Sequence, residues 1–167
     1  MSDVEKMTVK AQEAMQAAAK MAESKGNSAV EPEHLLSQLV TQSDGFVPGL
    51  ITQAGGQLPG VKRDLEVALA RLPQVTGSAK RVVASQRLVQ LFNRAEVEAR
   101  ALGDEYISTE HFLLAVLSEG AAPDIAKLFK NNGLTRNKVE EAVNKMRGGR
   151  KITDDSPEGT MDALKKY

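Results

Sequence analysis

The sequence predicts an all-α fold made of two pseudo-symmetric four-helix repeats. Residues 30–36 (VEPEHLL) return as residues 107–113 (ISTEHFL), which places His34 and His111 77 positions apart. The same offset pairs Ala18 with Ala95 in the flanking sequence. Only 4% of the residues are aromatic and none is Trp, so Ala, Leu, Val and Met must form the interior, which favours closely packed helices. One structural unit is therefore expected twice.

The first repeat is expected in residues 1–73. Residues 2–5 (SDVE) form a possible capping box, and Thr8 is a second possible N-cap for a helix that ends at Gly26. Apolar residues at steps of three and four between these points indicate one buried stripe. The next helices are predicted over residues 32–40 and 48–54, and from Pro59 onward.

The second repeat is expected in residues 85–147, after a joint over residues 74–84 that has little periodicity. Ser85 is predicted to cap a long helix that ends at Gly103, and Ser108 to cap the sixth helix. The seventh helix is expected over residues 124–130, and Thr135 should cap the eighth. Residues 148–167 are polar and rich in turn formers, which predicts a flexible linker toward an ATPase module absent from this chain. The chain is therefore expected to be a fragment.

The totals exclude several classes of function. There are 22 basic and 22 acidic residues, and a net charge of zero argues against a nucleic-acid-binding surface. The absence of cysteine excludes disulfides, thiolate metal sites and a Cys nucleophile. No apolar run could span a membrane, and the amino end lacks the layout of a signal peptide. A cytoplasmic protein without membrane or nucleic-acid partners is expected.

Several stretches resemble the amino-terminal Clp repeat domain of the AAA+ unfoldases. They are residues 31–36 (EPEHLL), 71–75 (RLPQV) and 102–111 (LGDEYISTEH). Within that family, the joint and the tail, residues 146–149 (MRGG) and 163–167 (ALKKY), are similar to the ClpB family of protein disaggregases. The resemblance covers essentially the whole chain and implies the doubled helical fold.

The resemblance also implies what the parent protein does. A parent of this family forms a hexamer, hydrolyses ATP with Mg²⁺ in two AAA+ modules and threads aggregated polypeptide with an Hsp70-class co-chaperone. The sequence contains no Gly-x-x-x-x-Gly-Lys-Ser/Thr phosphate loop. The fragment itself is therefore expected to need no cofactor and to be no enzyme.

The two histidines are interpreted as structural. His34 and His111 occupy matching first-turn positions, where a side chain can form a local hydrogen bond. Neither has a partner at a metal-ligand spacing, and no base-and-nucleophile set is present. No catalytic residue and no metal ligand are predicted.

The resemblance places a polypeptide-binding role on Thr8, Asp104 and Glu110. The alternative for Glu110 is complementation of the helix dipole, and for Asp104 a solvated charge. Flexible apolar side chains near the starts of the first and fifth helices suit recognition of varied hydrophobic segments. The apolar candidates are Val9, Leu88 and Phe92, whereas Met15 and Leu91 are favoured as core. The basic residues Arg147, Arg150, Lys151, Lys165 and Lys166 are expected to lie in solvent.

The predicted function is substrate docking for a ClpB-like, ATP-dependent disaggregase. The domain is expected to bind exposed hydrophobic segments of unfolded or aggregated protein and to pass them to the ATPase rings. The alternative is an adaptor-binding amino-terminal domain of a ClpA- or ClpC-like protease unfoldase. A promiscuous apolar surface would favour the first function, and a polar face specific for one folded partner the second.

Overall fold

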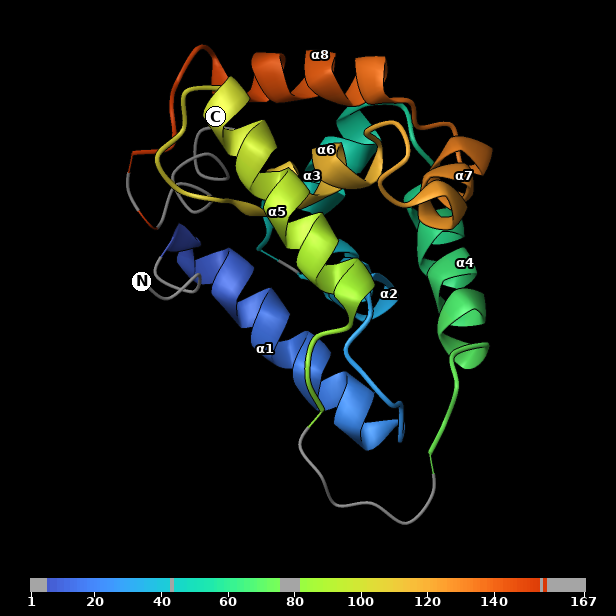
Figure 1. Cartoon of the computed structure of the whole chain (residues 1–167). Coiled ribbons are helices and arrows are strands. Elements are labelled where there is room, and N and C mark those ends of the chain that lie inside the picture. The colour runs from blue at the N-terminus through green and yellow to red at the C-terminus, as the bar shows by residue number, and fades with distance from the viewer. Residues whose placement is uncertain (1–5, 43, 76–81, 154, 156–167) are drawn as a thin grey trace.

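The computed structural model describes residues 6–42, 44–75, 82–153 and 155 (Figure 1). The helices of the first repeat are α1 (Val9–Ser24), α2 (Pro32–Thr41), α3 (Phe46–Gln53) and α4 (Leu58–Ala70). Those of the second are α5 (Gln86–Ala101), α6 (Thr109–Val116), α7 (Pro123–Asn131) and α8 (Arg136–Arg147). Extended pairing within these ranges is confined to isolated bridges. The all-α prediction with two four-helix repeats is confirmed; residues 2–5 lie outside the described ranges.

Side-chain caps start the long helices where the sequence predicts them. The Thr8 hydroxyl accepts a hydrogen bond from Ala11 N at 3.3 Å and begins α1. The Ser85 hydroxyl accepts one from Leu88 N at 3.1 Å and begins α5. Thr135 caps α8 in the same way. Each cap satisfies an amide that has no partner within its helix.

Three helices begin earlier than predicted, and one of them is α4, which starts at Leu58 rather than Pro59. α3 starts at Phe46, two residues before Pro48, because the amides of a helix's first turn need no acceptor within the helix and a proline is tolerated there. α7 starts at Pro123 rather than Asp124, for the same reason. The boundary errors therefore come from treating proline or its neighbour as the first residue.

The core is centred on α2 and α6, the two helices that begin with the repeated Glu-His motif. Every residue of α6 is buried, as is most of α2, since both are covered on all sides. α1 packs against α2, and α5 packs against α6. In Figure 1 α8 lies across one end of this arrangement and α4 and α7 stand along one side.

The repeats bind each other through equivalent backbone hydrogen bonds. Thr8 N donates to Ile107 O at 2.9 Å, and Ser85 N donates to Val30 O at 2.9 Å. The offset of 77 relates Thr8 to Ser85 and Val30 to Ile107. Each repeat therefore donates an equivalent backbone hydrogen bond to the other. This reciprocity is expected for two repeats related by a pseudo-twofold axis between α1 and α5.

A second contact between the repeats joins the start of α4 to the end of α7. Gln57 N donates to Asn132 O at 2.8 Å, and Asn132 Nδ2 donates to Asp64 Oδ2 at 2.9 Å. A Cβ atom on Gly60 would lie 2.0 Å from Asn132 Oδ1, so this approach requires glycine. The two repeats are consequently interlocked at both ends of the shared core.

Candidate functional site

The first repeat holds its motif histidine in a neutral hydrogen-bonded state. His34 Nδ1 accepts from Glu31 N at 2.8 Å, so the ring proton is on Nε2, which donates to Asn27 Oδ1 at 2.8 Å. Burial of the ring lowers the pKa of His34 below 6.5 because it penalises the imidazolium, even though the nearby Glu31 carboxylate opposes the shift. His34 closes a capping box at the start of α2.

The second repeat repeats this geometry with a charged partner. His111 Nδ1 accepts from Ser108 N at 2.8 Å, and His111 Nε2 donates to Asp104 Oδ2 at 2.7 Å. Asp104 stands 77 positions after Asn27, so the two histidines bind equivalent residues. The predicted structural role of His34 and His111 as local hydrogen-bonding groups is confirmed.

Arg147, at the end of α8, completes the second network. Its Nη1 lies 2.7 Å from Asp104 Oδ2, and its Nη2 lies 2.8 Å from Glu110 Oε2. Ser108 Oγ donates to the other Glu110 oxygen. The Arg147 residue is 4% exposed, so the prediction of a solvated Arg147 is wrong. The guanidinium is buried because two carboxylates neutralise it there.

The electrostatics of this cluster favour the charged forms of Asp104 and Arg147. Burial raises the pKa of Asp104, but hydrogen bonds from His111, Ile152 N and Arg147 outweigh it and hold the pKa below its ordinary value. Burial likewise opposes the charge of Arg147, yet Glu110 and Asp104 raise the pKa of its guanidinium. The solvated-charge alternative for Asp104 is therefore wrong, because its carboxylate has several protein partners.

The structure divides the predicted polypeptide-binding residues into two groups. Thr8, Asp104, Glu110 and Leu88 are buried and contact other parts of the domain. Val9 is 39% exposed, and Phe92 is partly buried with its ring 6.2 Å from that of Phe112. The binding role of all six residues stays a prediction. Only Val9 and Phe92 present apolar surface that a ligand could contact directly.

A half-exposed surface is formed by flanks of α1 and α5, two helices that run in opposite directions in Figure 1. Lys6 Nζ, just before α1, lies 3.0 Å from Glu96 Oε2 on α5, so the flank of α5 that carries Glu96 faces α1. Helical spacing places Val89 and Phe92 on this flank. On α1, Lys10 Nζ is bound at 2.8 Å by Asp44, so its side turns away from α5.

We call this surface the α1–α5 face. It comprises Gln12, Met15 and Ala19 on α1, and Val89, Phe92 and Glu96 on α5. These two sets correspond one to one at the offset of 77, so each repeat contributes the equivalent flank. Val89 is 48% exposed, while Met15, Ala19 and Phe92 are partly buried against the core. Val9 lies at its edge.

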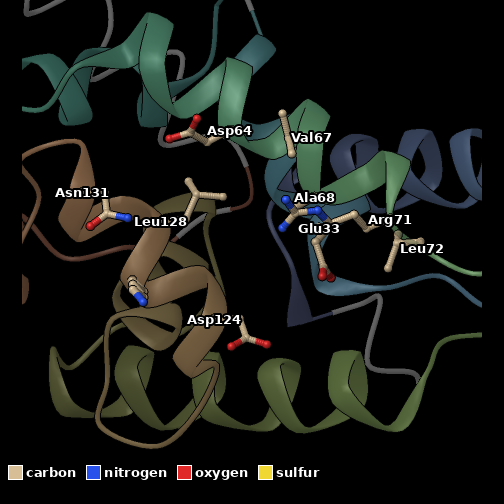
Figure 2. Close-up of a pocket in the computed structure, with 10 residues that line it drawn as sticks. Glu33, Asp64, Val67, Ala68, Arg71, Leu72, Asp124, Leu128 and Asn131 are labelled. Carbon is tan, nitrogen blue, oxygen red and sulfur yellow. The ribbon is translucent and has the colours of Figure 1, made fainter.

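A cleft of about 590 Å³ lies elsewhere, between α4 and α7. Figure 2 shows Asp64 and Val67 on α4, with Leu128 and Asn131 on α7. Its lining mixes apolar side chains with charges of both signs, including Arg71. Val67 is 46% exposed. This surface is separate from the α1–α5 face.

Sequence reasoning missed several contributors, and the repeat offset points to two that matter most here. Val89 is the equivalent of Gln12, and Asn27 is the equivalent of Asp104, so aligning the two copies more fully would have shown both. Arg147 has no such signal, because it is charged, stands among polar residues and begins a run that resembles a linker. Its partners Asp104 and Glu110 lie about forty positions earlier in the chain.

The described residues contain neither a cluster of metal ligands nor a membrane-spanning helix. No group of three or more His, Asp and Glu side chains within them has an arrangement that could hold a metal ion. None of the described helices is long and apolar enough to cross a membrane.

Known proteins similar to this chain share its sequence family and fold. The family model described as the Clp repeat (R) N-terminal domain matches residues 6–132. The chaperone protein ClpB of Bdellovibrio bacteriovorus is 44% identical over 161 residues, which cover 96% of this chain and 19% of that protein. The chain thus spans about a fifth of the length of such relatives.

Two solved structures show the same fold. The Hsp104 N-terminal domain from Candida albicans has a TM-score of 0.77 at 22% identity, covering 91% of this chain and 98% of that one. A complex of the ClpV N-domain with a VipB peptide has a TM-score of 0.69 at 18% identity, covering 92% of each chain.

Proposed function

Because the chain belongs to the family of Clp repeat N-terminal domains, we propose that it is the substrate-docking domain of a ClpB-like, ATP-dependent protein disaggregase. In this proposal the domain binds exposed hydrophobic segments of unfolded or aggregated protein and passes them to ATPase rings. The rings belong to a parent hexamer that binds ATP and Mg²⁺ and cooperates with an Hsp70-class co-chaperone. This chain spans 19% of the length of the similar Bdellovibrio bacteriovorus protein, so the proposal assigns those modules to sequence outside this chain.

The observation that carries the proposal is the α1–α5 face. It exposes apolar groups of varied shape, namely Met15, Val89 and Phe92, on two helices that are fixed by caps and by bonds between the repeats. Methionine side chains can adapt to ligands of different sequence, and an aromatic ring adds a large apolar contact area. The Lys6–Glu96 ion pair forms a polar rim beside them.

A surface of this kind supports weak, reversible binding. Weak binding is needed because a segment that will be threaded must be released. A contact of a few hundred Å² is below the size of stable protein interfaces, so we expect an affinity of about micromolar or weaker. The ClpV N-domain complex supports the proposal at the level of the fold, since a domain of this architecture holds a peptide there.

The test compares two exposed valines on different surfaces. Val89→Asp places a charge on the α1–α5 face, and Val67→Asp places one in the α4–α7 cleft, where the side chain is equally accessible. Both positions are about half exposed, so each variant should keep its stability within about 0.5 kcal/mol. Binding to reduced, carboxymethylated α-lactalbumin, followed by fluorescence anisotropy, should weaken at least about tenfold in Val89→Asp, or about 1.4 kcal/mol.

Val67→Asp should bind this unfolded protein like the unaltered chain. Native α-lactalbumin should not bind either form, because its apolar segments are buried. Equal binding by Val89→Asp and the unaltered chain would remove the α1–α5 face as the docking surface.

The second candidate function is docking of a specific folded adaptor, as in ClpA- or ClpC-like unfoldases. The α4–α7 cleft favours it, because its lining mixes Asp64, Arg71 and Lys127 with apolar side chains and so suits one defined partner. If Val67→Asp loses binding to the unfolded protein while Val89→Asp keeps it, the docking site would lie in this cleft and not on the α1–α5 face.

A further inference from the structure

The residues that follow α8 are built into the domain. Ile152 is fully buried, its N–H donates to Asp104 Oδ1 at 2.9 Å, and its carbonyl accepts from Glu105 N at 2.8 Å. Lys151 Nζ donates to Leu102 O at 2.8 Å. We call residues 151–153 and 155 the exit segment. The sequence assigns these residues to a linker, but Ile152 is not solvated and the segment is held on the second repeat.

The exit segment is the counterpart of the joint that leaves the first repeat. Gln74 Nε2 donates to Lys25 O at 3.1 Å, and the offset of 77 maps these residues onto Lys151 and Leu102, which form the same contact. Asn27 Nδ2 donates to Pro73 O, directly before the joint, at 3.1 Å. In each repeat, Asn27 or its equivalent is therefore one of the residues that fix the chain leaving the repeat.

Asp104, the equivalent of Asn27, has two side-chain oxygens that accept hydrogen bonds, whereas an asparagine has one. Asn27 has one acceptor oxygen, which His34 occupies, and it holds the joint by donating. Asp104 accepts at both oxygens, from His111 and Arg147 at Oδ2 and from Ile152 N at Oδ1. A carboxylate is thus needed to hold the histidine and the exit segment together.

The exit segment in turn accepts a hydrogen bond from the first residue of α1, one of the two helices that form the α1–α5 face. Asp155 O accepts from Val9 N at 2.7 Å, and Val9 is the first residue of α1. This amide is one of those that a helix cannot satisfy internally. The chain leaving the second repeat therefore helps to fix the amino end of α1.

We propose that Asp104 is a positioning residue for the docking face, acting through the exit segment that it fixes and through the Asp155–Val9 hydrogen bond. The proposal rests on the proposed docking function of the α1–α5 face. It gives Asp104 a role although its carboxylate is buried and bonded within the domain.

Asp104→Asn tests the first step, because it gives the second repeat the residue type of the first. The new amide oxygen can accept from His111 and Arg147, but the amide N–H₂ then takes the place of Oδ1 and faces another donor, Ile152 N. We expect faster hydrogen exchange at the amides of Ile152 and Val9, with protection retained in α2 and α6. Unchanged exchange at both amides would show that Asp104 does not hold the segment.

Ile152→Ala tests the second step without touching the Arg147 ion pairs. It should release the exit segment and weaken binding of reduced, carboxymethylated α-lactalbumin at least about fivefold, the lower range of coupling between sites. Val75→Ala is the matched control, since Val75 is the equivalent position in the joint and is half exposed. It should leave both exchange at Val9 and binding unchanged.

The double variant separates coupling from general destabilisation. If both residues act through the exit segment, Asp104→Asn combined with Ile152→Ala should bind no more weakly than the worse single variant. Faster exchange at Val9 with unchanged affinity would overturn the positioning role. Absence of binding by the unaltered chain would instead refute the docking function, and the exchange data would still show whether Asp104 fixes the segment.

Discussion

His34 shows how a single buried side chain makes the first repeat sensitive to acid. Its Nδ1 accepts from Glu31 N, so protonation of the ring breaks the capping box of α2. Because the pKa of His34 is lowered in the fold and is 6.5 when the chain is unfolded, the unfolded state binds more protons below pH 6.5. The stability that His34 provides is thus full above about pH 6.5 and decreases as the pH falls toward the folded pKa.

Urea unfolding at pH 7.5 and pH 5.5 measures this effect. The unaltered chain should lose more stability between the two values than His34→Gln, which lacks the titrating group. Asp104 does not interfere, because the pKa of its carboxyl lies below 3.8 in the fold. An equal loss in both proteins would contradict the assignment of His34 as a buried neutral histidine.

At the scale of elements, Arg147 fastens the end of α8 to the start of α6. Its two ion pairs join it to Asp104 and Glu110, which are buried with it. Arg147→Met keeps the length of the side chain but leaves both carboxylates without their charged partner. We expect the free energy of unfolding to fall by about 3–5 kcal/mol, as when one member of a buried pair is removed.

The neighbouring arginine is the control for this change. Arg150 is exposed, so Arg150→Met should alter stability by no more than about 0.5 kcal/mol. Both variants are compared by urea unfolding at pH 7. A loss in Arg147→Met as small as that in Arg150→Met would mean that the ion pairs contribute nothing to the docking of α8.

The elements themselves could be predicted because their signals are local. Thr8, Ser85 and Thr135 cap helices by bonding amides three residues away, so a short stretch of sequence contains the whole interaction. The roles of Asp104 and Arg147 could not be predicted in the same way, since they depend on contacts across the fold. The exit segment shows the same limit, because its polar sequence resembles a linker while Ile152 is buried.

At the scale of the whole molecule, the sequence repeat predicts the pseudo-twofold arrangement of the helices. The residue differences between the two repeats give the domain distinct surfaces. The pseudo-twofold relation brings equivalent flanks of α1 and α5 together, and the sequence offset alone could have paired Met15 with Phe92. It could not show which of the predicted residues are accessible. Thr8, Glu110 and Leu88 are buried, whereas Val9 and Phe92 border solvent, because burial depends on the packing of both repeats.

Docking on the α1–α5 face is tested most directly by titrating isotope-labelled domain with reduced, carboxymethylated α-lactalbumin and recording amide and methyl shifts by NMR. We predict shifts that cluster at Met15, Ala19, Val89 and Phe92, with none when native α-lactalbumin is added. The α4–α7 cleft, reported by Val67, should stay unchanged. Shifts confined to that cleft, or no shift with the unfolded protein, would contradict the proposed docking function of the α1–α5 face.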